Sequence, residues 1–148
     1  MIDAIRKRLA AGEPCIGAWL TAPSPLVAEA MASLGFFHWL AVDMEHTSIT
    51  LETAMAAFAA AERHGCAPLV RLPSADSDIA RRCLDIGCQG LIVPGVEDAD
   101  AFAAFIEPCL HRPAGRRGVS LGRHNAWGDR FDDDRSTFKP LVVPMIES

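Results

Sequence analysis

The sequence predicts an α/β fold built on a parallel sheet, either doubly wound or closed as a (β/α)8 barrel. Short, continuous apolar runs of strand length alternate along the chain with longer segments whose apolar residues recur at helical spacing. The runs lack apolar–polar alternation, which is typical of parallel strands that are covered on both faces. No G-x-G-x-x-G follows the first run, which weakens a dinucleotide-binding fold.

Glycine and proline mark the boundaries of the first elements. Gly12 and Pro14 end the N-terminal helical pattern, in which charged and apolar residues are mixed. Pro25 stands near the start of the second helix and Gly35 stops it, while Gly65 closes the third. These signals predict helices at 1–12, 22–35 and 49–63 and strands at 15–20 and 39–42.

The same alternation continues through the second half of the chain. Gly87 closes a fourth helix, and Asp98 and Asp100 supply the acidic start that a helix dipole favours. We expect strands at 68–71, 91–93 and 141–146 and helices at 76–86 and 98–109. The stretch 114–140 is rich in glycine and predicts a long loop on the catalytic face, with room for a short helix. His111 and the acidic run 132–134 are expected at the surface.

Composition excludes several classes of function. The net charge of -5 and the pI of about 5.4 argue against binding to nucleic acid or to an anionic membrane. No apolar run is long enough to span a bilayer, and the N-terminus lacks the apolar core of a signal peptide, so the cytoplasm is the expected location. The five cysteines contain no C-x-x-C pair and are expected to be reduced thiols.

Polar side chains follow three of the predicted strands at the point where each strand ends. Asp43, Glu45 and His46 follow the second strand, Arg71 ends the third and Glu147 follows the fifth. Because the carboxyl ends of parallel strands share one edge, these groups are expected to converge in one cleft.

This set of residue types suits metal-assisted acid–base chemistry on an anionic substrate. Carboxylates are the ligands that hard divalent cations prefer, and such a metal can polarise a ketone. Arginine can bind a 2-oxo acid in a fixed plane, and histidine can accept the proton of a hydroxyl group. A Schiff-base route is disfavoured, because the only lysines, Lys7 and Lys139, lie away from the predicted cleft.

Several short segments in a fixed order resemble the HpcH/HpaI aldolases, and together they cover nearly the whole chain. The segments are 16–20 (IGAWL), 42–46 (VDMEH), 70–71 (VR), 84–87 (LDIG), 91–94 (LIVP), 117–119 (RGV) and 146–148 (IES). The resemblance implies a (β/α)8 TIM barrel that binds a divalent cation such as Mg2+, Mn2+ or Co2+. It also implies a class II aldolase that cleaves 4-hydroxy-2-oxo acids to pyruvate and an aldehyde, or runs the reverse reaction.

The resemblance assigns roles to individual positions. Glu147 is similar to a metal ligand of the family, and Arg71 to the residue that stabilises the enolate. His46 is similar to the acid–base residue, and the family pattern pairs it with Asp85. The role of Asp85 is implied by the resemblance alone, since the residue pattern places it late in a helix.

Other positions complete or depart from the family pattern. Asp43 and Glu45 would hold metal-bound water behind the ligands, and Arg123 is a further candidate for substrate binding. Met145 stands where the family usually has glutamine, and Pro144 before it predicts a local irregularity in the last strand. The family's second metal-binding carboxylate follows a sixth strand, which this sequence does not reach.

We therefore expect residues 1–148 to form the N-terminal part of a single TIM-barrel domain, apparently truncated. The expected partners are a small 2-oxo acid and an aldehyde, and a homo-oligomer is expected from the resemblance. Two alternatives stay open. The chain could be a non-catalytic barrel fragment that oligomerises through an open sheet edge, or a lyase that acts on citramalyl-type thioesters.

Overall fold

A computed structural model describes residues 1–147 and confirms the α/β fold with a parallel sheet. The described strands pair in sequence order, and each pair is parallel. They are β1 (Gly17–Leu20), β2 (Trp39–Asp43), β3 (Ala67–Arg71), β4 (Gly90–Val93) and β5 (Leu141–Pro144). Ser148, the last residue of the segment that resembles the family, lies outside the described residues.

Helices connect successive strands, as the periodicity predicts. Ser24, Thr50, Asp76 and Asp98 each accept a hydrogen bond from a backbone N–H of the helix that follows, which fixes where the helix begins. The helices are α1 (Ile2–Ala10), α2 (Pro25–Ser33), α3 (Leu51–Arg63), α4 (Ser77–Asp85), α5 (Ala99–Ile106) and α6 (Phe131–Thr137), with 3₁₀ turns η1 (Glu107–Cys109) and η2 (Arg123–Gly128). The expected long loop thus contains two short helical pieces, η2 and α6.

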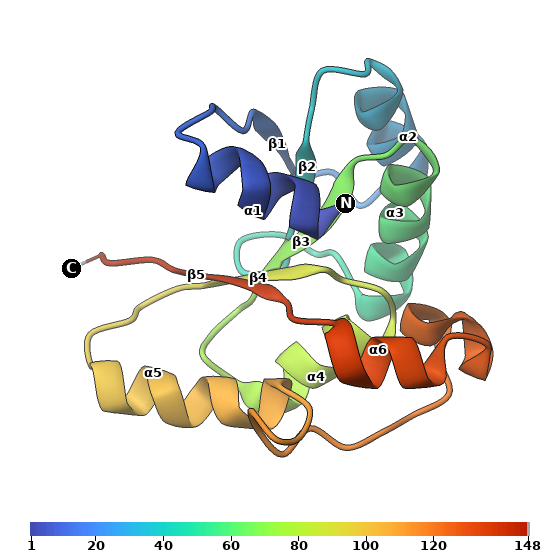
Figure 1. Ribbon diagram of the computed structural model, residues 1–148. Coiled ribbons are helices and arrows are strands. Elements are labelled where there is room, and N and C mark those ends of the chain that lie inside the picture. Colours follow the sequence, from blue (N-terminus) through green and yellow to red (C-terminus); the bar gives the residue numbers. More distant parts are fainter. Residues whose placement is uncertain (148) are drawn as a thin grey trace.

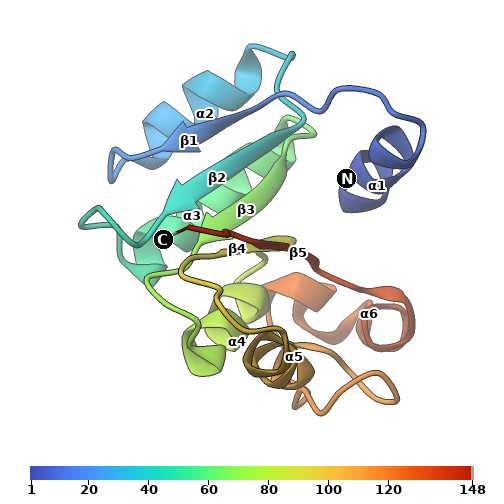
Figure 2. The same cartoon turned by 90° about the vertical axis from the view of Figure 1, so that its left-hand side faces the viewer.

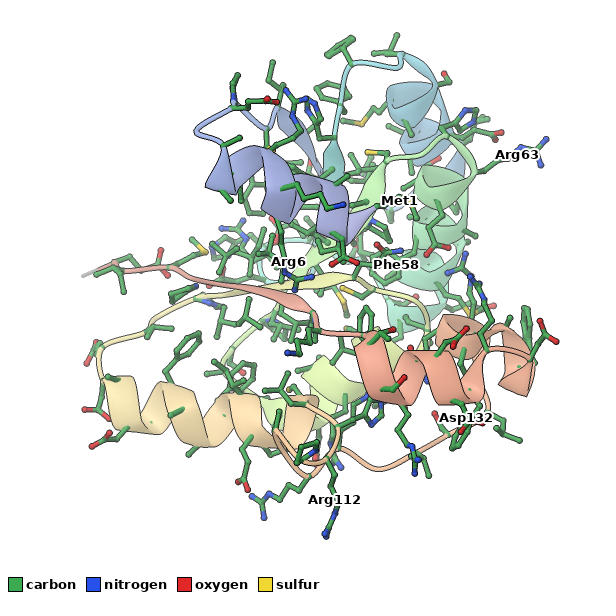
Figure 3. The ribbon with its side chains drawn as sticks, viewed as in Figure 1. Met1, Arg6, Phe58, Arg63, Arg112 and Asp132 are labelled. Atoms are coloured by element: carbon green, nitrogen blue, oxygen red, sulfur yellow. The ribbon has the colours of Figure 1, made fainter. Side chains whose placement is uncertain are left out.

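The two faces of the sheet bury different side chains. Leu40, Val42 and Val70 pack with α2 to α5 in the larger core, where Phe58 of α3 is completely buried (Figure 3). Ala41 and Leu69, one residue out of step, belong to a smaller core on the opposite face with the first helix, α1. Figures 1 and 2 show α1 on one side of the strands and α2 to α5 on the other. The odd-numbered residues of β2 and β3 therefore point to the face of the sheet that α1 covers, called the α1 face below.

Gly17 is required where β1 passes under Trp39. A Cβ atom at Gly17 would collide with the six-membered ring of Trp39, whose Nε1 donates to the carbonyl oxygen of Cys15 at 3.3 Å. We expect Gly17→Ala to lower the free energy of unfolding by about 1–3 kcal/mol through overpacking. Gly118→Ala is the matched control, because a Cβ atom at Gly118 would meet nothing within 4 Å. Urea denaturation should separate the two variants, and equal stabilities would contradict this account.

All five cysteines are unpaired, as predicted, and all but Cys15 are buried. Burial raises the pKa of the Cys66 and Cys109 thiols to about 11 and that of Cys83 to about 12. These thiols are therefore protonated and unreactive at neutral pH. Among residues 1–147, no helix is long and apolar enough to cross a membrane.

Three expectations about the C-terminal third are wrong. Pro144 causes no break in register, because it pairs with Val93 like the other residues of β5. The N–H groups of Leu141 and Met145 donate toward β4, so in this alternation the nitrogen of Pro144 faces away from β4 and no ladder hydrogen bond to it is lost. His111 is buried rather than at the surface, since it packs beneath the helical pieces of the long segment and faces Asp134. Asp134 lies in α6 and is largely buried, not in a solvated turn.

Candidate active site

The carboxyl ends of β2 and β3 hold a buried ion pair. Asp43 and Arg71 are registered partners on the two strands, and both point to the α1 face. Arg71 Nε donates to Asp43 Oδ1 at 3.0 Å and Nη2 donates to Oδ2 at 2.6 Å. Asp43 is 2% exposed. A bidentate contact of this kind fixes the plane of the guanidinium group.

The same carboxylate also folds the loop that follows β2. The backbone N–H groups of Glu45 and His46 donate to Asp43 Oδ1 at 3.0 and 3.3 Å, and the Thr47 hydroxyl donates to the Asp43 carbonyl oxygen. Burial acts to raise the pKa of Asp43, but the hydrogen bonds from Arg71 and from these two N–H groups outweigh it, so the pKa lies below its ordinary value. Asp43 therefore stays charged and positions both Arg71 and the loop.

Arg71 is surrounded by groups that favour its charge. Its guanidinium carbon lies 4.9 Å from the ring centroid of Trp19 on β1, and its Nε lies 3.4 Å from Glu45 Oε2. The hydrogen bond to Asp43, and the charges of Asp43, Glu45 and Glu147, raise the pKa of Arg71 against the opposing effect of burial. Among the described residues, no acceptor bonds to Arg71 Nη1, which leaves this donor available to a ligand.

Glu45 and His46 stand next to this arginine. Glu45 Oε2 is buried and has no hydrogen-bond partner among the described residues. His46 Nε2 lies 3.6 Å from that oxygen, and the imidazole is 67% exposed. The exposed ring can meet a substrate, while the carboxylate behind it can stabilise the imidazolium that forms on proton uptake.

Glu147 reaches the same edge of the sheet from β5. The N–H of Gly95, in the loop after β4, donates to Glu147 Oε1 at 3.0 Å. The charge of Glu147 is the smallest of the effects that raise the pKa of Arg71. The ends of β2, β3 and β5, which were expected to supply the polar groups, thus converge on the edge toward which the strands run (Figure 2).

The donors here fit a hard divalent cation in kind but are too few in number. Glu147 and Glu45 provide carboxylate oxygens, and Glu45 Oε2 has an unused buried lone pair. Within residues 1–147, no group of three His, Cys, Asp or Glu side chains is arranged to hold a metal ion. A cation at this edge would therefore need water, substrate or further protein oxygens.

Two predicted site residues lie elsewhere. Asp85 ends α4 and accepts from Arg117 Nη2 at 2.7 Å, so it is not paired with His46 in this chain. Arg123 bonds to Glu62, and its Nη1 donates to the Ile86 carbonyl oxygen at 3.5 Å. Asp85 ends the helix that leads into β4, and Arg123, which begins η2, contacts the chain just after that helix. The helix α4 runs back along the sheet, from the carboxyl end of β3 to the start of β4. They are therefore at the opposite end from Arg71.

One residue of the site is missed by the strand-end pattern. Trp19 lies within β1 rather than after it, yet its ring lies against the Arg71 guanidinium and is 42% exposed. The signal that could have found it is the strand period, since Trp19 pairs with Ala41 in register, on the same face as Asp43.

Comparison with known proteins agrees with this geometry. The family model described as HpcH/HpaI aldolase/citrate lyase matches residues 15–148. A 4-hydroxy-2-oxovalerate aldolase of Rhodococcus jostii (strain RHA1) is 38% identical over 128 residues, which are 86% of this chain and 49% of the relative. A 4-hydroxy-2-oxo-heptane-1,7-dioate aldolase of Shigella sonnei (strain Ss046) is 36% identical over all of this chain and 57% of its own length.

Solved structures agree as well. The crystal structure of an HpcH/HpaI aldolase/citrate lyase family protein from Burkholderia cenocepacia J2315 superposes with a TM-score of 0.88 at 30% identity, and covers 98% of this chain and 60% of that one. The chain spans about half the length of the curated relatives it matches. The sheet is thus that of a TIM-barrel family member, and the chain belongs to the HpcH/HpaI aldolase/citrate lyase family.

Proposed function

We propose that the chain contributes the enolising half of a metal-dependent, pyruvate-handling aldolase that acts on 4-hydroxy-2-oxo acids. The observation that carries the proposal is the convergence of Arg71, charged and fixed by Asp43, with the carboxylates of Glu45 and Glu147. The names of the aldolase relatives support the same class of substrate.

In cleavage, a base removes the proton of the 4-hydroxyl group, the bond between C3 and C4 breaks, and its electron pair moves onto the 2-oxo group to form the pyruvate enolate. The other product is the aldehyde. His46 is placed to accept the hydroxyl proton, since its ring is exposed and backed by Glu45. Protonation of the enolate at C3 then completes pyruvate.

Arg71 would bind the oxygen on which the negative charge develops. Nη1 is the donor available for this oxygen, because Nε and Nη2 already donate to Asp43. Glu147 would hold a divalent cation, with Glu45 ordering water beside it. When bound, that cation would supply further positive charge near the ketone and carboxylate of the substrate.

Exchange of the pyruvate methyl protons for deuterons tests this proposal, because exchange requires the enolate but no aldehyde. We expect the chain to catalyse exchange with Mg2+ or Mn2+ and to lose the activity when a chelator is added. Exchange that is insensitive to chelator would contradict metal dependence. A properly folded chain without exchange would assign the chemistry to the longer proteins only, as the fragment alternative holds.

The proposal also covers the class of substrate and the oligomeric state. The family description also covers citrate lyase, so a thioester of the citramalyl type is the alternative substrate, and its cleavage would form the enolate on the thioester product and release pyruvate as the ketone. Assembly into a homo-oligomer stays a prediction, which sedimentation equilibrium can test.

A further inference from the structure

The α1 face carries one tryptophan in each of two successive rows of paired residues. In the first row, nearest the amino ends of the strands, Trp39 of β2 pairs with Gly17 of β1. In the second row, Trp19 of β1 pairs with Ala41 of β2. The third row, at the carboxyl ends, holds Arg71 of β3. The two tryptophans therefore lead from the amino ends of the strands to the candidate active site.

Trp19 reaches Arg71 because the residue between them is small. The strands β1 and β3 are separated by β2, so paired residues on these two strands lie about 10 Å apart. Ala41 of β2, which lies between them, has no side-chain atom beyond Cβ and is completely buried. The Trp19 ring therefore extends across β2, and its centroid lies 4.9 Å from the guanidinium carbon of Arg71.

Trp39 is fixed by the backbone of β1 and by α1. Its Nε1 donates to the carbonyl oxygen of Cys15 at 3.3 Å. Its ring lies directly on the backbone of Gly17, where there is no room for a Cβ atom. It also packs against the smaller core, which contains Ile2 and Ile5 of α1. The position of this ring is thus set independently of the groups at the strand ends.

Trp19 has fewer constraints of its own. Its side chain is 42% exposed. Within residues 1–147, the tryptophan that donates a side-chain hydrogen bond is Trp39 and not Trp19. The two rings meet at 90° with their centroids 6.5 Å apart, which is the edge-to-face arrangement that aromatic pairs favour. The orientation of Trp19 beside Arg71 therefore depends on Trp39.

Trp19 completes the surroundings that Asp43 provides for Arg71. Asp43 accepts from Nε and Nη2 and so holds one edge of the guanidinium group. The Trp19 ring covers the group on another side and keeps water away from it, which strengthens the action of its charge. An enolate oxygen at Nη1 would then meet a charge that is fixed in place before the reaction.

We propose that Trp39 is a positioning residue of the enolising site, which holds Trp19 in place and, through it, Arg71. This rests on the proposed function, in which Arg71 binds the enolate oxygen. Trp39 does not touch the substrate, because it begins β2 whereas Asp43 ends it, about 13 Å away along the strand. Its effect is therefore on the rate of enolisation rather than on the binding of pyruvate.

Trp39→Leu tests the proposal through two independent measurements. In metal-dependent exchange of the pyruvate methyl protons, we expect kcat to fall about tenfold while KM for pyruvate stays within about twofold of the unaltered value. The NMR signal of the Arg71 Nε–H group, identified by its loss in Arg71→Lys, should also shift, because it lies in the ring current of Trp19. Trp39→Phe keeps an aromatic ring against Trp19 and should recover most of the rate.

Further variants separate positioning from a general loss of stability. If Trp39 acts through Trp19, adding Trp39→Leu to Trp19→Leu should lower kcat no further. Ile5→Ala is the matched control, because Ile5 belongs to the same smaller core. It should lower the free energy of unfolding but leave kcat and the Arg71 signal unchanged. If Trp39→Leu does not fold, Gly17→Ala displaces the Trp39 ring and should change both measurements in the same direction.

Each other outcome counts against the proposal or against the function on which it rests. An unchanged kcat with an unshifted Arg71 signal in folded Trp39→Leu would overturn the positioning role. Additive losses in the double variant, or an equal loss of kcat in Ile5→Ala, would overturn it as well. If the unaltered chain does not exchange the pyruvate protons, the proposed function fails, while the Arg71 signal still decides whether Trp39 positions that group.

Discussion

Replacing Arg71 by lysine should slow metal-dependent exchange of the pyruvate methyl protons by about 10²–10³-fold. Lysine keeps the positive charge, but its donors all lie on one nitrogen and cannot reproduce the planar fork that holds both oxygens of Asp43 while Nη1 faces the enolate. Proton and deuteron NMR of pyruvate measures the rate directly. Because the charge is retained beside the buried Asp43, the variant should stay folded, which circular dichroism checks.

Arg71→Ala should abolish exchange, but it also leaves Asp43 buried without its partner, at a cost of about 3–5 kcal/mol in stability. Loss of exchange in that variant alone would therefore not separate chemistry from unfolding. Arg63→Ala is the control for loss of a surface arginine and should leave the rate unchanged. An Arg71→Lys rate within about twofold of the unaltered rate would remove Arg71 from the enolising role.

The fold follows from local signals that tertiary contacts do not contradict. The apolar runs, the N-cap residues and the glycine stops each specify the same alternation of strand and helix, and helix and strand bounds shift by only a few residues. The long segment 114–140 is where the sequence predicts least. Its two helical pieces include Ala126 and Trp127 with positive φ, a conformation that residue preferences do not suggest.

The part of the site that lies at strand ends could be predicted from the sequence. Asp43 and Arg71 end neighbouring parallel strands, so strand ends alone place them together. Asp85 and Arg123 have no such constraint within the chain, because helix ends and loops at the start of β4 face the other end of the sheet. Burial of His111 depends on how α6 and η2 pack over it, which no local pattern indicates.

Asp43→Asn should lower the free energy of unfolding by about 3–5 kcal/mol at neutral pH, since it removes the charge that faces the largely buried Arg71. The pKa of Asp43 is depressed in the folded chain. Its contribution to stability is therefore complete above the unfolded-state pKa of about 3.9 and is lost as the pH falls through the lower folded-state pKa. Urea denaturation from pH 7 down to pH 3 measures both effects.

The difference in stability between the unaltered chain and Asp43→Asn should thus be constant above about pH 5 and shrink below about pH 4. Asp132→Asn is the control, because Asp132 is an exposed acidic residue in the first turn of α6 (Figure 3). Its cost should stay below about 1 kcal/mol, as expected for a charge near a helix N-terminus. A gap for Asp43→Asn that stays constant down to pH 3 would show that the lost contact is not the ionised one. Asp43 would then hold the loop through geometry alone, and the charge of Arg71 would have to be balanced by Glu45 and Glu147.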